Sequence, residues 1–236
     1  MAVYITGDMH GSAYRLNPGT IRFFLRDSRK ELSEEDIVIV CGDFGMPWGN
    51  GSGCVNNLRD LDGLAEQPFT ILFIDGNHEN FDLLEKLPVE EKFGGMVHRV
   101  RDNIFHLLRG EIYSISGRTF FAFGGAASVD RGYRVAHESW WPQEVCTEDE
   151  KFRALANLEK CGYKVDYVLT HAAPERFILK KFSKKIISPC PTSRFLSELE
   201  PKLKYRKWYF GHYHIDNQSK RRREQWMYES IIKIID

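Results

Sequence analysis

Five short apolar runs, each followed directly by a turn that carries Asp, His or Asn, constrain the fold of this chain more than any other feature. The clearest is residues 69–75, a run rich in β-branched and aromatic residues that leads into the turn Gly76-Asn77-His78-Glu79-Asn80. Such a run predicts a buried strand that ends at the glycine. Because α/β proteins bind their ligands at the carboxyl ends of strands, the side chains of this turn are candidates for a site.

The other four runs repeat this arrangement along the chain. Their turns lie at 7–11, 42–45, 171–174 and 211–214, and the five turns together hold five of the eight histidines. A single Gly-Asp or Gly-His pair after a strand is most often only a turn. Five such turns with the same residue types are hard to ascribe to chance. The candidate site residues in these turns are Asp8, His10, Asp43, Asn77, His78, His171, His212 and His214.

These residue types predict a metal centre. Carboxylate, imidazole and amide oxygen ligands suit manganese, iron, zinc or similar ions, and the lack of thiolate ligands argues against a structural zinc site. Asp8 with His10, and His212 with His214, are two residues apart, so in extended backbone each pair points to one side and can grip one ion. One carboxylate can bridge two ions, and two ions about 3.5–4 Å apart can clamp a phosphoryl group and lower the pKa of a bound water.

The order of the predicted elements indicates an α/β fold. In the first third, strands alternate with predicted helices over 18–32 and from Val55 to Pro68, which favours a parallel sheet with crossover helices. Residues 97–124 alternate short apolar runs with turns, including a hairpin turn at 116–118, and predict antiparallel strands of a second sheet.

The last third returns to strand–loop–helix order. A capping box at Thr147 opens a helix that ends at Gly162, a further helix is expected at about 192–200, and the last strands at 207–210 and roughly 225–235. Neither a low-complexity linker nor an internal repeat is present. We therefore expect one domain over 1–236 that contains two packed sheets.

Composition bounds the partners. The 33 basic and 33 acidic side chains cancel, so no overall field would draw this protein to nucleic acid or to an anionic membrane. Local basic runs keep nucleic acid open as a partner: Lys180, Lys181, Lys184, Lys185, Arg221, Arg222 and Arg223.

The same sequence favours a cytoplasmic location. The five cysteines have no regular spacing, which fits a reducing compartment. The first predicted strand begins at about the second residue, leaving no room for a signal peptide, and no apolar stretch is long enough to span a bilayer. We therefore expect no membrane partner, and the sequence does not determine the oligomeric state.

As a set and in this order, the motifs resemble those of the calcineurin-like metallophosphoesterases: Asp-x-His, Gly-Asp, Gly-Asn-His-Glu, a lone His and Gly-His-x-His, from residue 7 to 214. The resemblance implies an α/β fold, a four-layer αββα sandwich of two mixed β-sheets flanked by helices, with a dinuclear centre. It implies that Asp8, His10 and His214 hold a first ion. It implies that Asn77, His171 and His212 hold a second and that Asp43 bridges the two. Mn²⁺ is the first candidate for both ions, with iron, zinc, nickel or cobalt as alternatives.

The resemblance also assigns a role to His78, which would lie beside the phosphate as proton donor or transition-state stabiliser. One departure concerns its surroundings. In the family the second motif often continues to a further Asp, commonly followed by Arg, whereas here residues 44–48 after Asp43 contain neither. The carboxylate that would orient His78 and the guanidinium that would grip the phosphate are therefore missing from that place.

The chain has one adjacent Asp-Arg pair in a glycine-rich loop after a strand, Asp130-Arg131. We hypothesise that this loop turns into the site, with Asp130 near His78 and with Arg131 or Arg134 facing the phosphate. Competing partners for the imidazole are Asp82 and, less favoured, Glu79. In the alternative without a functional role, Asp130 caps a turn and Arg131 is solvated.

The expected function is a metal-dependent phosphoesterase in which a hydroxide that bridges the two ions attacks phosphorus. A phosphomonoester, either a phosphoprotein or a nucleotide, is the favoured substrate. A phosphodiesterase or nuclease on the same centre is the first alternative. A non-catalytic scaffold of the same fold is the second, although such a protein should have lost ligands, and all seven positions carry competent residues.

Overall fold

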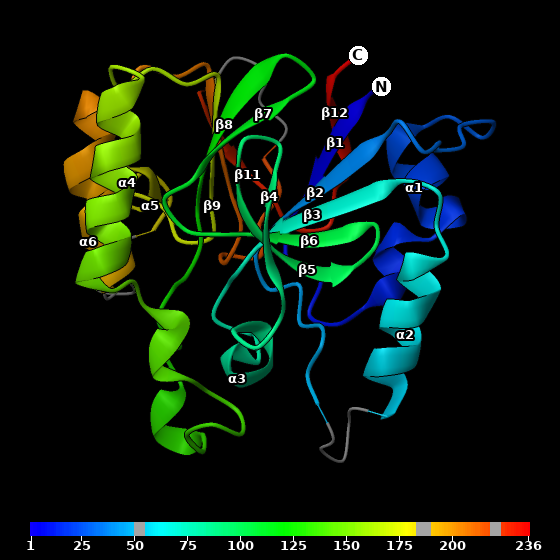
Figure 1. The fold of residues 1–236 in the computed structure, drawn as a ribbon, viewed down its shortest axis with the longest axis horizontal. Helices are drawn as coiled ribbons and strands as arrows, with labels where there is room; N and C mark the ends of the chain where they lie inside the picture. Colours follow the sequence, from blue (N-terminus) through cyan, green and yellow to red (C-terminus); the bar gives the residue numbers. More distant parts are fainter. Residues whose placement is uncertain (50–54, 183–189, 218–222) are drawn as a thin grey trace.

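Two β-sheets packed face to face, with helices on both outer sides, form the protein (Figure 1). The computed structural model describes residues 1–49, 55–182, 190–217 and 223–236. From one side to the other, the layers are α1 and α2, the first sheet, the second sheet, and then α4, α5 and α6. The predicted four-layer α/β sandwich of two mixed sheets is confirmed.

The first sheet places three of the motif-bearing strands side by side. In the described chain it has seven strands, in the order β12-β1-β2-β3-β6-β5-β4. β1, β2, β3 and β6 run parallel to one another, while β12, β5 and β4 are antiparallel to their neighbours. The strands are β1 (Val3–Thr6), β2 (Ile37–Cys41), β3 (Thr70–Ile74), β4 (Val89–Lys92), β5 (Gly95–Arg101), β6 (Ile104–Leu107) and β12 (Ile232–Ile235).

The second sheet carries the other two motif-bearing strands. Within the same described ranges it has five strands, in the order β11-β10-β9-β8-β7, of which only β7 is antiparallel to its neighbour. The strands are β7 (Ile112–Ile115), β8 (Arg118–Phe123), β9 (Tyr167–Thr170), β10 (Lys207–Phe210) and β11 (Glu224–Trp226).

The helices lie on the outer faces of the sheets, apart from the single-turn α3, which follows the Gly-Asn-His-Glu motif (Figure 1). Side chains start several of them: Asn17 accepts from the backbone N–H of Thr20 at 2.8 Å, and Thr147 forms the predicted capping box with Glu150. The helices are α1 (Pro18–Leu25), α2 (Val55–Ala65), α3 (Phe81–Leu84), α4 (Glu148–Lys160), α5 (Glu175–Ile178) and α6 (Pro191–Leu199). Short 3₁₀ turns occupy Ala13–Leu16, Arg131–Tyr133, Pro142–Glu144 and Glu200–Lys202.

Three apolar layers hold the sandwich together, which is why the central strands are apolar on both faces. In β2, for example, Val38 and Val40 pack toward the helices, whereas Ile37 and Ile39 pack toward the second sheet. The third layer lies between the second sheet and its helices. Among the described helices, none combines the length and the apolar character needed to cross a membrane.

Three sequence predictions about elements were wrong. The helix expected over 18–32 ends at Leu25, because Arg26 adopts a left-handed backbone conformation with φ 55° and closes the helix. Strands β5 and β6 join the first sheet rather than the second, because β6 pairs in parallel with β3. The strand expected at 225–235 is two strands, β11 in the second sheet and β12 in the first. The hairpin turn at 116–118 is confirmed between β7 and β8.

Candidate metal centre

The five motif turns meet at one place, where the carboxyl ends of β1, β2 and β3 face those of β9 and β10. Asp8 follows β1 and accepts from the backbone N–H of His212, after β10, with N–O distances of 2.9 and 3.1 Å. Asp43 follows β2, and its Oδ1 lies 3.2 Å from Nε2 of His171, after β9. The site is therefore built by both sheets.

Asp8, His10 and His214 form a first donor group. The Nε2 atoms of the two histidines are 3.0 Å apart, and Nε2 of His214 lies 3.4 Å from Oδ2 of Asp8. Asp8 is fully buried, whereas the side chains of His10 and His214 are 34% and 49% exposed. This group therefore opens toward solvent, where a substrate would approach.

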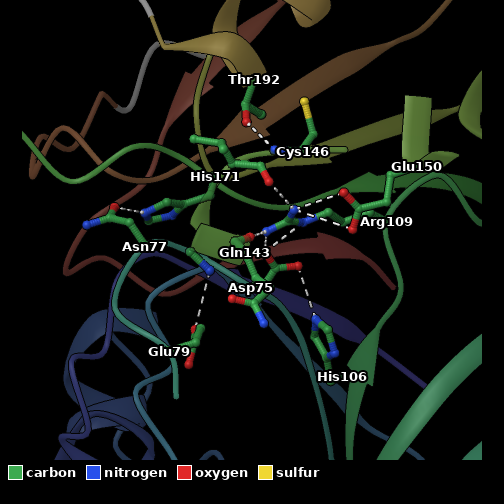
Figure 2. Close-up of polar contacts among 12 residues, drawn as sticks. Asp75, Asn77, Glu79, His106, Arg109, Gln143, Cys146, Glu150, His171 and Thr192 are labelled. Carbon is green, nitrogen blue, oxygen red and sulfur yellow. Dashed lines mark hydrogen bonds and ion pairs between the residues drawn. The ribbon is translucent and has the colours of Figure 1, made fainter. Parts of the chain in front are cut away.

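Asn77, His171 and Asp43 converge on the buried side of the site. Asn77 and His171 point toward each other (Figure 2), and Oδ1 of Asn77 lies 3.3 Å from Nε2 of His171. Nδ1 of His171 donates to the Cys41 carbonyl at 2.9 Å, so in the neutral ring the lone pair is on Nε2, which faces the carboxylate and the carboxamide. His212 lies beside this group, with its ring centre 5.0 Å from that of His171.

The arrangement fits metal ions. Two ligand atoms bound to one ion at about 2.0–2.2 Å and at roughly a right angle are about 3 Å apart. The donor pairs described above have spacings of this size, and the donor atoms lie within 4.8 Å of one another in each of three groups. In the described chain these groups are Asp8 with His10 and His214, His10 with Asp43 and His78, and Asp8 with Asp43 and His171. His212 belongs to none of the three.

The electrostatics of the protein alone show why a cation suits this site. Burial raises the pKa of Asp8 to about 7 and lowers the pKa of His10 to about 4 and of His212 to about 3. Burial also opposes the charged form of His171, but Asp43 and Asp8 outweigh it and raise its pKa to about 10. The buried carboxylates thus rely on one imidazolium for neutralisation, and a bound cation would take over that role while leaving the imidazoles neutral.

Tight backbone packing and strained conformations hold the ligands in place. A Cβ on Gly76 would overlap the carboxylate of Asp43. Left-handed backbone at non-glycine residues is uncommon and recurs at functional sites, where it costs free energy. Four candidate ligands adopt it, namely His10 (φ 49°), Asp43 (φ 49°), His212 (φ 69°) and His214 (φ 50°).

Comparison with known families agrees with this geometry. A profile of calcineurin-like phosphoesterases matches residues 1–216, most of the chain. The chain belongs to this family. This match confirms the family resemblance of the motifs. Members of the calcineurin-like phosphoesterase family are hydrolases of phosphate esters.

Two curated relatives align with 91% of this calcineurin-like phosphoesterase. They are the lariat debranching enzyme of Drosophila pseudoobscura pseudoobscura, 25% identical over 247 residues, and lariat debranching enzyme A of Xenopus laevis, 23% identical over 243 residues. The chain covers 42% and 43% of these proteins, less than half of their length. A solved structure described as a 5'-nucleotidase from Staphylococcus aureus in complex with alpha-ketoglutarate aligns with 98% of this chain and 50% of that one. Its TM-score is 0.48 at 15% identity.

The loop after β8 reaches the phosphoesterase motif through Arg134. Nη1 of Arg134 lies 3.3 Å from Nδ1 of His78, and the same atom donates to the Ser139 carbonyl at 3.0 Å. Nε and Nη2 of Arg134 each donate at 2.8 Å to the two carboxylate oxygens of Asp130. The loop therefore turns toward His78, with Arg134 between the imidazole and Asp130. Arg131 is exposed, and its carbonyl accepts from the backbone N–H of Arg134 at 3.1 Å. Within the described residues its guanidinium contacts no other site residue.

The two competing carboxylates lie elsewhere. Asp82 pairs with His137, with an oxygen 3.0 Å from its Nδ1. Glu79 is buried and accepts from the backbone N–H groups of Phe44 and Gly45 at 2.8 and 2.9 Å. Glu79 thus fixes the turn that carries Asp43.

A buried ion-pair network supports the Gly-Asn-His-Glu turn from behind (Figure 2). Asp75, the last residue before Gly76, is paired with Arg109, whose Nε donates to the carboxylate at 2.9 Å. Arg109 also donates to Glu150 of α4 at 3.1 Å and to the Gln143 carbonyl at 2.8 Å. Asp75 and Arg109 are both almost fully buried, so loss of either partner would leave an uncompensated charge in the core.

Of the three described members of the basic runs, two have partners within the chain. Lys180 pairs with Glu224 at 2.6 Å, and the guanidinium of Arg223 covers the ring of Tyr205 at 4.1 Å from its centre. Lys181 is exposed. The other members, Lys184, Lys185, Arg221 and Arg222, lie outside the described residues.

Two residues at the site were missed by sequence reasoning. Ser128 accepts from Nδ2 of Asn77 at 3.2 Å, and Tyr228 stacks on the ring of His214. Ser128 stands in the glycine-rich loop that the sequence had already singled out, so its neighbourhood was a usable signal. Tyr228 lies outside every motif, and nothing in the sequence pointed to it.

Proposed function

We propose that this calcineurin-like phosphoesterase hydrolyses phosphate esters at a dinuclear metal centre. The observation that carries the proposal is the convergence, from both sheets, of donor atoms with the spacing of shared ligands. When bound, two such ions neutralise phosphoryl oxygens and lower the pKa of a water that attacks phosphorus. The proposed ligands are Asp8, His10 and His214 at one ion, Asn77, His171 and His212 at the other, and Asp43 between them.

Mn²⁺ is the proposed ion, with iron, zinc, nickel or cobalt as alternatives. The ligands are hard carboxylate and amide oxygens together with imidazole nitrogens, a set that Mn²⁺ and its neighbours accept and that contains no thiolate. We propose that substrate enters over His10 and His214, the exposed ligands.

His78 is proposed to stabilise the transition state as a neutral hydrogen-bond donor. Arg134 is always protonated and can only donate, so its contact makes Nδ1 of His78 an acceptor and leaves the proton on Nε2. Burial lowers the pKa of His78, and the Arg134 charge adds to that lowering. A neutral imidazole donates a hydrogen bond well but gives up its proton poorly, so we expect a preference for esters with good leaving groups.

Asp130 and Arg131 have different proposed roles. Asp130 binds both edges of the Arg134 guanidinium and so positions the group that contacts His78. Arg131 begins the short 3₁₀ turn that follows Asp130, and its guanidinium makes no hydrogen bond or ion pair within the described residues. Its guanidinium is the proposed contact for the phosphate of a bound substrate.

A phosphomonoester, from a phosphoprotein or a nucleotide, is the first candidate substrate. A phosphodiester in nucleic acid is the second, and one observation favours it: both curated relatives are named as lariat debranching enzymes. Activity of the Mn²⁺-loaded protein on p-nitrophenyl phosphate and on bis-p-nitrophenyl phosphate separates the two. A higher kcat/KM on the diester would make the second candidate the better one.

The role of His78 is tested by two substitutions. His78→Ala should keep two bound metals and lose about 10²–10³-fold in kcat, the usual cost of removing one transition-state hydrogen-bond donor. His78→Gln keeps an N–H donor and should recover part of the loss. Full activity of His78→Ala on an ester with a poor leaving group would contradict this role.

The metal centre itself is tested by Asp43→Ala, measured by elemental analysis after reconstitution with Mn²⁺. Loss of the shared carboxylate should leave fewer than two ions per chain. Most of the activity should be lost as well. If the unmodified protein binds one ion or none, the dinuclear proposal fails.

A further inference from the structure

The segment 227–230 lies against the metal centre although it is outside the residues that the family profile matches. The backbone carbonyl of Tyr228 accepts from Gly7, the residue just before Asp8, at 3.2 Å. It also accepts from Nη1 of Arg15 at 2.6 Å. The segment is therefore bound to the turn that carries the first candidate ligands.

Asp216 fixes the same segment from the other side. This residue is two positions after His214, and its carboxylate accepts from the backbone N–H groups of Tyr228, Glu229 and Ser230 at 2.9, 3.0 and 3.0 Å. A carboxylate that accepts several backbone N–H groups is strongly held in place. The turn that carries His214 and the segment 227–230 therefore form one connected unit.

The ring of Tyr228 lies flat on the ring of His214. The ring centres are 4.6 Å apart and the planes differ by 15°. His214 needs such support, because its side chain is 49% exposed and its backbone is in the left-handed region. An exposed imidazole without a neighbour would sample several rotamers and lose entropy on binding an ion. With Tyr228 in place, Nε2 of His214 stays near Asp8 and His10.

The geometry points to Tyr228 as a positioning residue that holds His214 ready for the ion shared with Asp8 and His10. This inference rests on the proposed function, since it presumes a metal at that group. It assigns the role to the flat ring and not to the phenol oxygen. Groups that orient metal ligands typically contribute about 10–100-fold to metal affinity.

Mn²⁺ binding to the metal-free chain of residues 1–236, measured by isothermal titration calorimetry, tests the inference with two variants. Tyr228→Phe keeps the ring and should bind both ions within about twofold of the unmodified protein. Tyr228→Leu removes the flat ring and should lose about tenfold or more in affinity at one of the two sites. Unchanged affinity of Tyr228→Leu, or an equal loss in both variants, would overturn the inference.

A third variant covers the case in which Tyr228→Leu does not fold, judged by near-ultraviolet circular dichroism of the metal-free protein. Arg15→Met frees the Tyr228 carbonyl and removes the guanidinium that lies 5.7 Å from the centre of the Tyr228 ring, while both rings stay in the chain. It should weaken the same site by a smaller factor. Unchanged binding in Arg15→Met would then overturn the inference. If the unmodified chain binds no metal, the proposed function itself fails, which is a different outcome from loss of the Tyr228 effect.

Discussion

The orientation of one carboxamide decides whether Asn77 can serve as a ligand. The oxygen and nitrogen ends of the group have nearly the same shape, but only the oxygen can bind a cation. Nδ2 of Asn77 donates to Oγ of Ser128, which turns Oδ1 toward His171. Ser128 is itself fixed, because its backbone N–H donates to Glu144 at 3.0 Å. A single hydroxyl thus selects the competent face of the ligand.

The orienting role of Ser128 predicts that the effect of Ser128→Ala on Mn²⁺ binding depends on whether residue 77 is Asn or Asp. Ser128→Ala should weaken Mn²⁺ binding about tenfold, because the carboxamide is then free to turn its NH₂ group toward the ion. In an Asn77→Asp background, both side-chain ends are oxygens, so the same Ser128→Ala change should have little further effect. Ser128→Thr keeps the hydroxyl and serves as the control. Equal losses in both backgrounds, measured by titration calorimetry, would contradict the orienting role.

At the scale of elements, the antiparallel pair β5–β6 carries two stacked histidines that contact the ion-pair network behind the site. His98 and His106 face each other in the strand register, with their Nδ1 atoms 3.0 Å apart. Nε2 of His106 lies 3.1 Å from Asp75. Because the Asp75 carboxylate only accepts, His106 donates to it and His98 donates to His106. Burial lowers the pKa of His98 to about 4, and the neighbouring His106 adds to the lowering.

The His98 shift predicts how stability depends on pH. An unfolded histidine has a pKa of about 6.5. Between pH 6.5 and 4 the unfolded chain therefore binds a proton that folded His98 does not, and stability is lost as pH falls through this window. Going from pH 6.5 to 4.5, His98 should account for about 2 kcal/mol of the lost free energy of unfolding. Urea unfolding at the two pH values measures this contribution. In His98→Gln, the free energy of unfolding should fall between pH 6.5 and 4.5 by about 2 kcal/mol less than in the unmodified protein. An unchanged decrease would mean that His98 is protonated in the folded protein.

Elements that depend on local signals were predictable from the sequence, whereas the pairing of strands was not. The Thr147 capping box and the hairpin turn at 116–118 involve residues within a few positions of one another. The assignment of β6 to the first sheet depends on its pairing with β3, more than thirty residues away. No periodicity in the sequence indicates that pairing.

The same distinction holds for the site. The eight candidate site residues stand in five turns that each directly follow a strand, so the motifs located them, and the structure brings the five turns together. The contact of Arg134 with His78 joins residues 56 positions apart and depends on the path of a loop. Asp130 was expected beside the imidazole, and its carboxylate instead binds Arg134, which in turn contacts His78. That path is set by packing around Glu144 and Ser128, which a sequence pattern does not show.

For the whole molecule, the main consequence of the fold is that the two sheets share one centre. Four candidate ligands follow strands of the first sheet and three follow strands of the second. An ion bound by both sets stabilises the contact between the sheets, and it binds the unfolded chain far less well. Metal and fold should therefore be thermodynamically linked.

Chelation should thus lower the melting temperature. At Mn²⁺ a hundredfold above its Kd, one site adds about 2.7 kcal/mol, which for a chain of this size is about 5–10 °C in Tm relative to the protein in EDTA. The single domain predicted over 1–236 implies one transition in both conditions. Differential scanning calorimetry checks both statements, with Asp43→Ala as the control that should show little rise. An equal rise in the control would indicate metal binding elsewhere.

The left-handed backbone at four ligand positions predicts which substitutions would accumulate if metal binding were lost. The positions are His10, Asp43, His212 and His214. Glycine adopts that conformation without the cost of about 1 kcal/mol or more that other residues incur. A descendant freed from the need to bind metal would gain stability by acquiring glycine at these positions, and it would drift toward them. Selection for metal binding would keep the four non-glycine residues at these positions. A descendant of the same fold that no longer binds metal would be expected to carry glycine there instead.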